Sequence, residues 1–256
     1  MPWPPSDHGR ACRGSSSRTC TAAKTKPFWP RNPLLLLWFS VAFLIVANGV
    51  TQGRSISSRV AHQEIRFEEK LDAEQRLSNL GYWTGPVDGN LDPASRHALI
   101  AFQKFEGRNR TGLLTSGELD ALRSAGRPRP RFTGYYHVEV DLRRQVLFIV
   151  DSDDRVSRIL PICTGSGKLY SDGGQTGRAH TPRGKFKVLR KINGWRRSPL
   201  GLLYYPSYIF KGVAIHGSRA VLTYPASHGC IRIPLFAAKG FSELTPIGTD
   251  VVVYDI

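Results

Sequence analysis

Acidic side chains are scarce in this chain of 256 residues, which carries 20 Asp and Glu against 36 Lys and Arg. The resulting formal net charge of +16 favours a polyanionic partner or surface, either nucleic acid or an anionic cell envelope. Hydrophobic and charged residues are both present in ordinary amounts, at 41% and 22%, which argues against wholesale disorder. The length suits about two small domains with tails.

Cysteine is also sparse. The four cysteines, Cys12, Cys20, Cys163 and Cys230, include no CxxC pair and form no dense framework. A disulfide scaffold is therefore not expected. Cys163 follows the apolar stretch 159–162 and is expected to be a packed thiol, whereas Cys230 lies among glycine and histidine.

One apolar run without charge, from Leu34 to Ala47, follows a basic stretch with six Lys or Arg and a single acid. A helix over Pro33–Val50 would be roughly 27 Å long, enough for a thin bilayer. We expect residues 1–33 to be a basic cytoplasmic tail and residues 34–50 to be a transmembrane anchor or a signal segment. The anchor is favoured because the basic start is long for a signal peptide, and a buried core helix is the weakest alternative. Both export readings place the chain from about residue 55 onward outside the cytoplasm.

Between residues 67 and 125, hydrophobic residues recur at helical spacing. Three short helices with start or stop signals are expected. The first runs from Phe67 to Leu80 and is closed by Gly81; the second begins at Pro93 after the cap residue Asp92 and ends at Gly107; the third opens with the capping box Thr115-Ser116-Gly117-Glu118 and stops at Gly126. Three helices of this length form a small bundle. The basic, proline-rich stretch 127–131 is expected to be an extended linker that ends this domain.

The segment 67–125 resembles the small peptidoglycan-binding-like domain that many cell-wall enzymes carry. The matching residues are packing and turn positions: Gln75-Arg76-Leu77, Leu80-Gly81-Tyr82, Val87-Asp88-Gly89, Ala101-Phe102-Gln103 and Thr111-Gly112-Leu113. The resemblance implies either targeting to the wall or a spacer role, and a packing pattern does not choose between the two.

From residue 134 the hydrophobic period changes from helical to alternating. Short strands separated by turn residues are expected at 137–142, Val146–Val150, Val156–Cys163, Gly184–Leu189, Tyr208–Phe210, Val213–His216 and Asp250–Tyr254. With one helix near Leu235–Glu243, this predicts a mainly β domain over residues 134–256, either a sandwich or a partly closed barrel. The fold class expected for the whole chain is multidomain α + β, with a small three-helix N-terminal domain. The long Gly-rich loop from Thr164 to Pro182 is expected to be functional.

Two short motifs carry reactive side chains. His216-Gly217 ends an apolar strand pattern, and Ser227-His228-Gly229-Cys230-Ile231-Arg232 follows it. A thiol with a pKa of ~8.5 is mostly protonated at neutral pH, so an imidazole that takes its proton and an arginine that stabilises the anion would activate Cys230. Gly217 and Gly229 allow backbone N–H groups to approach an oxyanion. The motifs together predict nucleophilic catalysis.

These motifs resemble the signature of L,D-transpeptidases of the YkuD type. Thr181-Pro182-Arg183-Gly184-Lys185-Phe186 is similar to the Thr-Pro-x-Gly-x-Phe segment of that family, and Thr164-Gly165 to its preceding glycine turn. The resemblance covers residues 135–256. The Ser-His-Gly-Cys-x-Arg motif is far more specific than a lone pair of cysteine and histidine.

The resemblance implies a role for each residue of the motifs. Cys230 would be the nucleophile, and His216 would accept and donate the proton, oriented by the carbonyl of Gly217. His228, Gly229 and the Cys230 N–H would shape the pocket and the oxyanion hole. Ser227 and Arg232 would contact the substrate, with Arg232 placing the site or a substrate carboxylate.

Family members cleave a tetrapeptide stem between diaminopimelate and the terminal D-Ala, and they hold the stem as a thioester. An amine of a neighbouring stem then forms a 3→3 cross-link, without a metal or organic cofactor. An L,D-carboxypeptidase or an enzyme that links protein to peptidoglycan is the alternative within the family. The expected partners are peptidoglycan stem peptides and the wall polymer, with the membrane if residues 34–50 are uncleaved, and no nucleic acid. The expected location is the cell envelope, outside the cytoplasm.

Four aromatic residues precede the first motif: Trp195, Tyr204, Tyr205 and Tyr208. They could form a lid over the stem peptide, with Tyr205 and Tyr208 as substrate contacts. Ordinary core packing is the alternative that we favour, since aromatic side chains dominate cores.

Three other functions are weaker. Zinc bound by His216, His228 and Cys230, with His180 as a further ligand, lacks the ligand spacing of known zinc sites. A non-catalytic wall-binding protein would not need an intact set of cysteine and histidines. A nucleic-acid binder is suggested by charge alone, and the export segment opposes it.

Overall fold

The structure, a computed structural model, describes residues 64–255. The predicted tail, 1–33, and the predicted anchor or signal segment, 34–50, lie outside the described residues. Within 64–255, no helix combines the length and the apolar character needed to cross a membrane.

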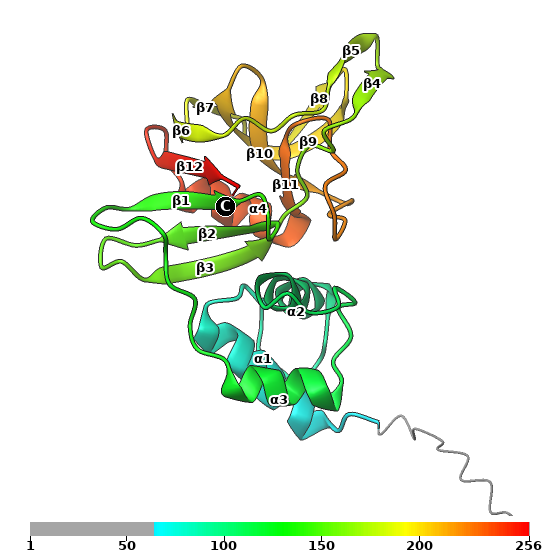
Figure 1. Ribbon diagram of the computed structural model, residues 1–256, viewed down its shortest axis with the longest axis vertical. Helices are drawn as coiled ribbons and strands as arrows, with labels where there is room; N and C mark the ends of the chain where they lie inside the picture. Colours follow the sequence, from blue (N-terminus) through cyan, green and yellow to red (C-terminus); the bar gives the residue numbers. More distant parts are fainter. Residues whose placement is uncertain (1–63, 256) are drawn as a thin grey trace, which may run out of the picture. The chain divides into compact units, whose positions relative to one another are not determined.

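The three predicted helices are confirmed as α1 (Phe67–Leu80), α2 (Pro93–Phe105) and α3 (Ser116–Ser124) (Figure 1). Asp92 caps α2 by accepting a hydrogen bond from the Ser95 N–H at 2.8 Å. The predicted capping box of α3 is only half formed. The Thr115 hydroxyl accepts from the Glu118 N–H, but the Glu118 carboxylate pairs with Arg108 at 2.9 Å instead of returning to the cap.

The remaining chain is mainly β and contains one helix, α4 (Leu235–Leu244) (Figure 1). Its strands are β1 (His137–Asp141), β2 (Val146–Val150), β3 (Val156–Pro161), β4 (Leu169–Asp172), β5 (Gln175–Arg178), β6 (Gly184–Lys187), β7 (Arg190–Lys191), β8 (Trp195–Ser198), β9 (Gly201–Phe210), β10 (Val213–Ser218), β11 (Ile231–Pro234) and β12 (Asp250–Tyr254). The seven predicted strands and α4 are confirmed, with shifts at their ends. The sequence did not predict β4, β5, β7, β8 and β11.

Within residues 64–255, the strands form two open five-stranded sheets and one hairpin, and none of the sheets closes into a barrel. The first sheet has the order β3-β2-β1-β12-β6, the second runs β11-β10-β9-β7 with β8 also paired to β9, and β4 pairs with β5. Buried side chains of both sheets and of α4 share one core, which includes Val140, Ile215 and Phe241. The predicted fold class, α + β with a mainly β domain, is therefore confirmed.

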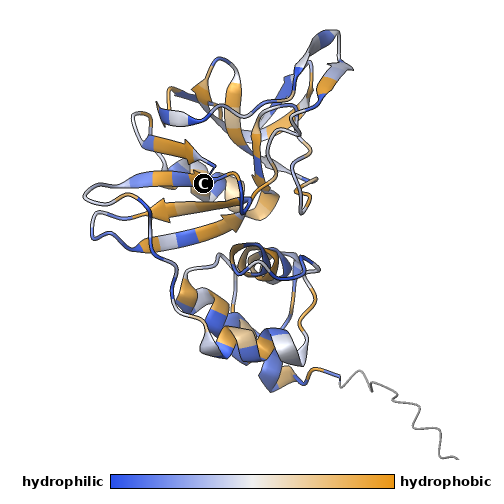
Figure 2. Ribbon diagram, in the orientation of Figure 1, coloured by the Kyte–Doolittle hydropathy of each residue, from blue (hydrophilic) through white to orange (hydrophobic). Residues whose placement is uncertain are grey.

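The opposite face of the first sheet is also buried, against the helices. Strand β2 is an unbroken apolar run, and such runs are typical of strands covered on both faces (Figure 2). Leu147 and Ile149 face the core between the sheets, whereas Val146, Phe148 and Val150 belong to a second core that includes Leu77 and Phe102 of the helices. The helices and the first sheet therefore stabilise each other directly.

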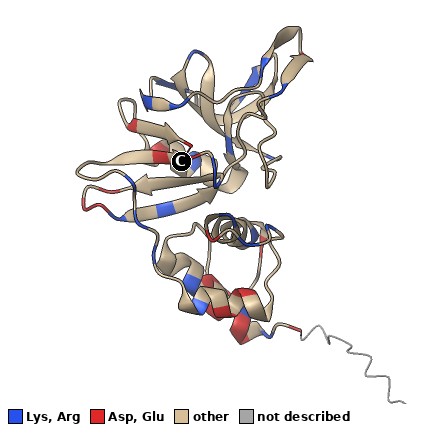
Figure 3. Ribbon diagram, in the orientation of Figure 1, with Lys and Arg blue, Asp and Glu red and all other residues tan. Residues whose placement is uncertain are grey.

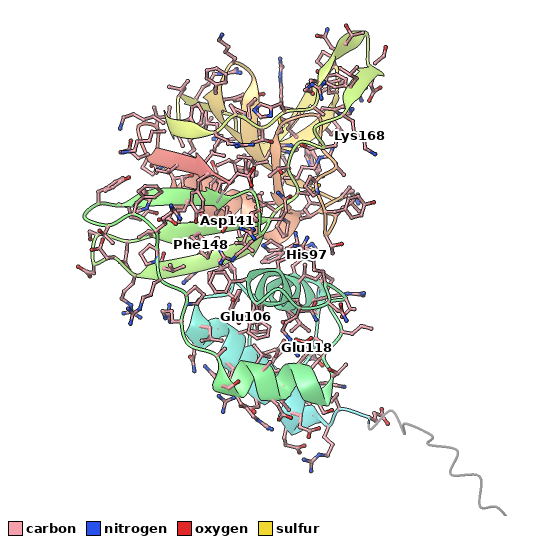
Figure 4. All side chains as sticks on the ribbon, in the orientation of Figure 1. His97, Glu106, Glu118, Asp141, Phe148 and Lys168 are labelled. Carbon is pink, nitrogen blue, oxygen red and sulfur yellow. The ribbon has the colours of Figure 1, made fainter. Side chains whose placement is uncertain are left out.

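Single contacts cross this second core. Phe148 of β2 meets Phe105 of α2 edge to face, with ring centroids 5.9 Å apart. Figure 4 labels Phe148 on the sheet and His97 on the neighbouring α2.

The predicted linker 127–131 is bonded to the folded chain at both of its ends. The Arg131 N–H donates to the buried Glu139 carboxylate at 2.8 Å, and the Arg127 guanidinium donates to the Val156 carbonyl at 2.9 Å. Glu139 also accepts from the Phe132 N–H and the Tyr254 hydroxyl, which explains how a carboxylate is buried in β1. These contacts anchor the stretch between the helices and the sheet.

Candidate active site

Two neighbouring parallel strands, β10 and β11, bring the two reactive motifs together. Their register places His216 opposite Arg232. Cys230 immediately precedes β11, two residues before Arg232, and side chains two apart on an extended chain share a face. All three residues line one cavity of about 670 Å³. The strand pairing therefore assembles a thiol, an imidazole and a guanidinium around a common space.

The His216 ring is oriented by its own neighbour. Its Nδ1 lies 3.0 Å from the Gly217 carbonyl oxygen, which is the contact that the family resemblance implied. Because a carbonyl only accepts, Nδ1 carries the proton and Nε2 keeps a free lone pair. Burial lowers the pKa of this imidazole to about 4; the Gly217 hydrogen bond opposes the shift, and the Arg232 guanidinium adds to it. The ring is therefore neutral at physiological pH and can accept a proton at Nε2.

The Cys230 thiol is half-buried at the start of β11, and its Sγ lies 3.9 Å from the Gly212 carbonyl oxygen. Burial raises the pKa of this thiol, and the Ala214 backbone and the Arg232 guanidinium oppose that shift. At rest the cavity is therefore lined by a neutral thiol and a neutral imidazole. A thiolate would form here only if a base such as the imidazole took the thiol proton.

The turn that carries Cys230 is held by two buried hydroxyls. The Ser227 hydroxyl donates to the Cys230 carbonyl at 2.6 Å and accepts from the Gly229 N–H at 3.0 Å. Thr181 donates to the Gly229 carbonyl at 2.7 Å. Gly229 has a φ of 140°, and a Cβ there would lie 2.9 Å from the His180 carbonyl oxygen. Ser227 lines the cavity, but its hydroxyl is engaged within its own turn.

His228 faces the β4–β5 hairpin, which lies inside the predicted Gly-rich loop Thr164–Pro182. Its ring lies 4.7 Å from the ring of Tyr170, and its Nε2 lies 3.6 Å from an Asp172 carboxylate oxygen. Tyr170 also lines the cavity. Sequence reasoning named neither Tyr170 nor Asp172, and the only signal was the unusual length of the loop.

Cations surround the cavity. Arg196 and Arg197 of β8 line it together with Lys211 and Arg232, and none of its lining residues in the described part of the chain is Asp or Glu. Figure 3 shows Lys and Arg on β8 and β11, while α1 and α3 carry many of the acidic residues. The cavity therefore suits a ligand with negative charge.

Of the four aromatic residues, one lines the cavity and the other three pack against one another. Tyr208 lines the cavity, and its ring lies 4.1 Å from the Arg190 guanidinium carbon. Tyr205 is not among the lining residues; its ring packs edge-on against Tyr204 at 4.7 Å, and Tyr204 packs against Trp195. Packing accounts for the contacts of Trp195, Tyr204 and Tyr205.

Gly217 and His180 complete the set of predicted residues. A Cβ at Gly217 would lie 2.6 Å from the Ala238 Cβ, so glycine allows α4 to pack against β10. His180 is exposed. Within residues 64–255, no group of three or more His, Cys, Asp or Glu is placed to hold a metal ion.

Comparison with protein families and solved structures identifies both parts of the chain. The YkuD model, an L,D-transpeptidase catalytic domain, matches residues 135–253, and a peptidoglycan binding domain model matches residues 69–122. No curated protein matches the chain.

Among solved structures, an L,D-transpeptidase from Xylanimonas cellulosilytica is 41% identical, with a TM-score of 0.68, covering 73% of this chain and 93% of the other. An L,D-transpeptidase from Stackebrandtia nassauensis is 24% identical, with a TM-score of 0.43, covering 73% of this chain and 91% of the other.

Proposed function

The chain belongs to the L,D-transpeptidase family, and from that premise we propose that it cross-links peptidoglycan stems by acyl transfer through Cys230. The observation that carries the proposal is the pairing of His216 with Arg232 across β10 and β11, with Cys230 at the start of β11 and all three in one cavity. The peptidoglycan-related domains indicate a cell-wall location outside the cytoplasm. Residues 34–50 would export or anchor the enzyme.

In the acylation step, Cys230 Sγ attacks the carbonyl carbon that joins diaminopimelate to the terminal D-Ala of a tetrapeptide stem. His216 Nε2 accepts the thiol proton as the S–C bond forms. The C–N bond then breaks, and His216 returns the proton to the leaving D-Ala amine. The products are free D-Ala and a thioester between Cys230 and the tripeptide stem.

The developing oxyanion needs an N–H donor near Cys230. The Gly229 N–H donates to the Ser227 hydroxyl, so we assign the oxyanion to the Cys230 N–H and the Arg232 guanidinium. Arg232 also favours the thiolate as it forms.

In the second step, the side-chain amine of a neighbouring stem attacks the thioester carbonyl. His216 accepts a proton from this amine while the C–S bond breaks, and the sulfur regains the proton as the thiol. The new amide is a 3→3 cross-link. Water in place of the amine would give a tripeptide, which is carboxypeptidase activity.

The charge around the cavity supports a stem peptide as the substrate. A tetrapeptide stem carries several carboxylates, and Arg196, Arg197 and Lys211 line the cavity with no opposing Asp or Glu among the described lining residues. Charge-assisted hydrogen bonds from arginine to a carboxylate are among the stronger polar contacts. These side chains are therefore placed to hold the stem while Cys230 attacks it.

Incubation of the chain with disaccharide-tetrapeptide, followed by mass analysis, tests the proposal. A dimer formed with loss of D-Ala is expected, and it should be absent with Cys230→Ala. Tripeptide alone would mean a carboxypeptidase, and cross-links formed by Cys230→Ala would overturn the assignment of the nucleophile. A carbapenem adduct on the wild type that Cys230→Ala lacks is an independent check of the thioester chemistry.

A further inference from the structure

The segment that leads into the nucleophile turn, residues 219–226, is held by three donors at three consecutive carbonyls. Leu222 accepts from Lys104 Nζ at 3.4 Å, Thr223 accepts from the Arg110 guanidinium at 2.8 Å, and Tyr224 accepts from the Cys163 thiol at 3.3 Å. Two of these donors, Lys104 and Arg110, belong to the helical region, residues 67–125, more than a hundred residues earlier in the chain. Lys104 of α2 and Arg110 of the α2–α3 connection therefore contact the backbone of the segment that precedes the nucleophile turn.

Lys104 is a costly residue to place here. Its side chain is in α2 and only 1% exposed, and its ammonium donates to the Ile162 carbonyl at 2.6 Å in addition to Leu222. Burial lowers its pKa to about 7; Arg110 adds to the shift and Cys163 opposes it. A buried ammonium is tolerated only where other acceptors replace water, and here the Ile162 and Leu222 carbonyls replace it.

The stretch after β3 continues the connection towards the site. Cys163 and Arg232 exchange backbone hydrogen bonds at 3.0 and 2.9 Å, and the Thr164 carbonyl accepts from the Ala226 and Ser227 N–H groups at 2.9 and 2.8 Å. The backbone of residues 162–164 is therefore bonded to Lys104 at one end and to the nucleophile turn and Arg232 at the other.

We propose that Lys104 and Arg110 are positioning residues of the active site: from the helical region, they hold residues 222–223 so that the following turn presents Cys230 to the substrate. The inference rests on the proposed function. It gives the peptidoglycan-binding-like region a role in catalysis that is separate from any contact with the wall. Neither residue touches the reacting atoms, so each acts through the backbone of the loop.

The test uses the full chain and the acylation of Cys230 by a carbapenem, followed by mass spectrometry over a range of carbapenem concentrations. The variants are Arg110→Ala, Lys104→Met and the conservative Arg110→Lys. Arg108→Ala is the matched control, because Arg108 is close in sequence but bonds Glu118 and the Gly117 carbonyl within the helical region. Hydrogen exchange at the Ala226 and Ser227 amides reports on the loop itself.

A misplaced nucleophile loses rate rather than binding, so Arg110→Ala and Lys104→Met should lower the maximum acylation rate by about 10- to 100-fold. The half-saturating concentration should change less than about twofold, the two amides should exchange faster, and Arg110→Lys should recover most of the rate. Arg108→Ala should acylate at the wild-type rate.

Wild-type acylation rates and amide protection in Arg110→Ala would overturn the inference, as would an equal loss of rate in Arg108→Ala. Because Lys104→Met removes a buried group and could unfold the chain, the Arg110 variants decide the result. A wild-type chain that forms no adduct would overturn the proposed function and this inference with it. A reactive wild type with equally reactive variants would overturn this inference alone.

Discussion

The hydroxyl of Thr181 donates a hydrogen bond to the carbonyl oxygen of Gly229, 48 residues later in the chain, at 2.7 Å. The same hydroxyl accepts from the Gly165 N–H at 2.9 Å, so it joins two glycine-containing turns next to Cys230, the proposed nucleophile. Thr181 is buried, which leaves water no route to replace these bonds. The Thr-Pro segment thereby fixes the back of the turn that presents Cys230.

Thr181→Val should therefore lower both stability and activity. The change keeps the side-chain shape but leaves the Gly229 carbonyl and the Gly165 N–H without their partner, at a cost of about 1–3 kcal/mol. Urea unfolding measures the stability, and carbapenem acylation measures the reactivity of Cys230. Thr133→Val, at an exposed threonine, is the control and should change neither. Unchanged stability of Thr181→Val would show that the turn does not depend on this hydroxyl.

The two histidines of the site should differ in their effect on activity. His216→Ala removes the proposed general base, and such losses are roughly 10²- to 10⁴-fold in rate. His228→Ala removes a cavity-lining ring that contacts Tyr170 and Asp172 but leaves the proposed general base in place, so its loss should be smaller. Steady-state cross-linking of disaccharide-tetrapeptide compares the two variants. Equal losses, or a larger loss for His228→Ala, would mean that the two roles have been exchanged.

Acylation of Cys230 should persist to unusually low pH. Burial lowers the pKa of His216 to about 4, below the ordinary 6.5, so the imidazole stays neutral and able to accept a proton at pH 5. The acid limb of the rate profile should therefore lie near pH 4. Acylation rates measured between pH 3.5 and 7 give the position of this limb. A limb near pH 6.5 would contradict the prediction.

The same shift has a consequence for stability. The imidazole of His216 binds a proton less readily in the folded chain than in the unfolded chain. Its contribution to the free energy of unfolding is therefore complete above pH 6.5 and is lost as pH falls towards 4. The pKa of His97 is also lowered to about 4, mainly by burial. His97→Gln should therefore weaken the pH dependence of unfolding while leaving the acid limb of acylation in place, which separates the two effects.

Arg196 and Arg197 should contribute to stem binding rather than to the chemical step. Replacing both by glutamine should raise KM for disaccharide-tetrapeptide several-fold with little change in kcat, because a contact kept through the reaction affects binding alone. The difference from wild type should shrink at high salt. Arg155→Gln, on the β2–β3 turn away from the cavity lining, is the control. An equal KM in the double variant would assign the stem carboxylates to other residues.

The sequence by itself determined the elements whose signals are local. Helix α2 follows from its cap residue Asp92 and its apolar spacing, and β2 follows from a continuous apolar run. The paired motifs around His216 and Cys230 were enough to predict a nucleophilic site. Strands β4, β5, β7 and β8 were missed because they are short and largely exposed, and pairing with a neighbour defines them more than hydrophobic pattern does.

Only the tertiary structure decided which distant groups support the site. No local signal connects Thr181 to Gly229, Asp172 to His228, or Arg110 to Thr223, because each contact depends on how sheets and helices pack. The burial that lowers the pKa of His216 likewise comes from the assembled core and not from neighbouring residues in the chain. A sequence motif indicates the candidate reacting groups, but their orientation and protonation depend on the packing of the whole fold.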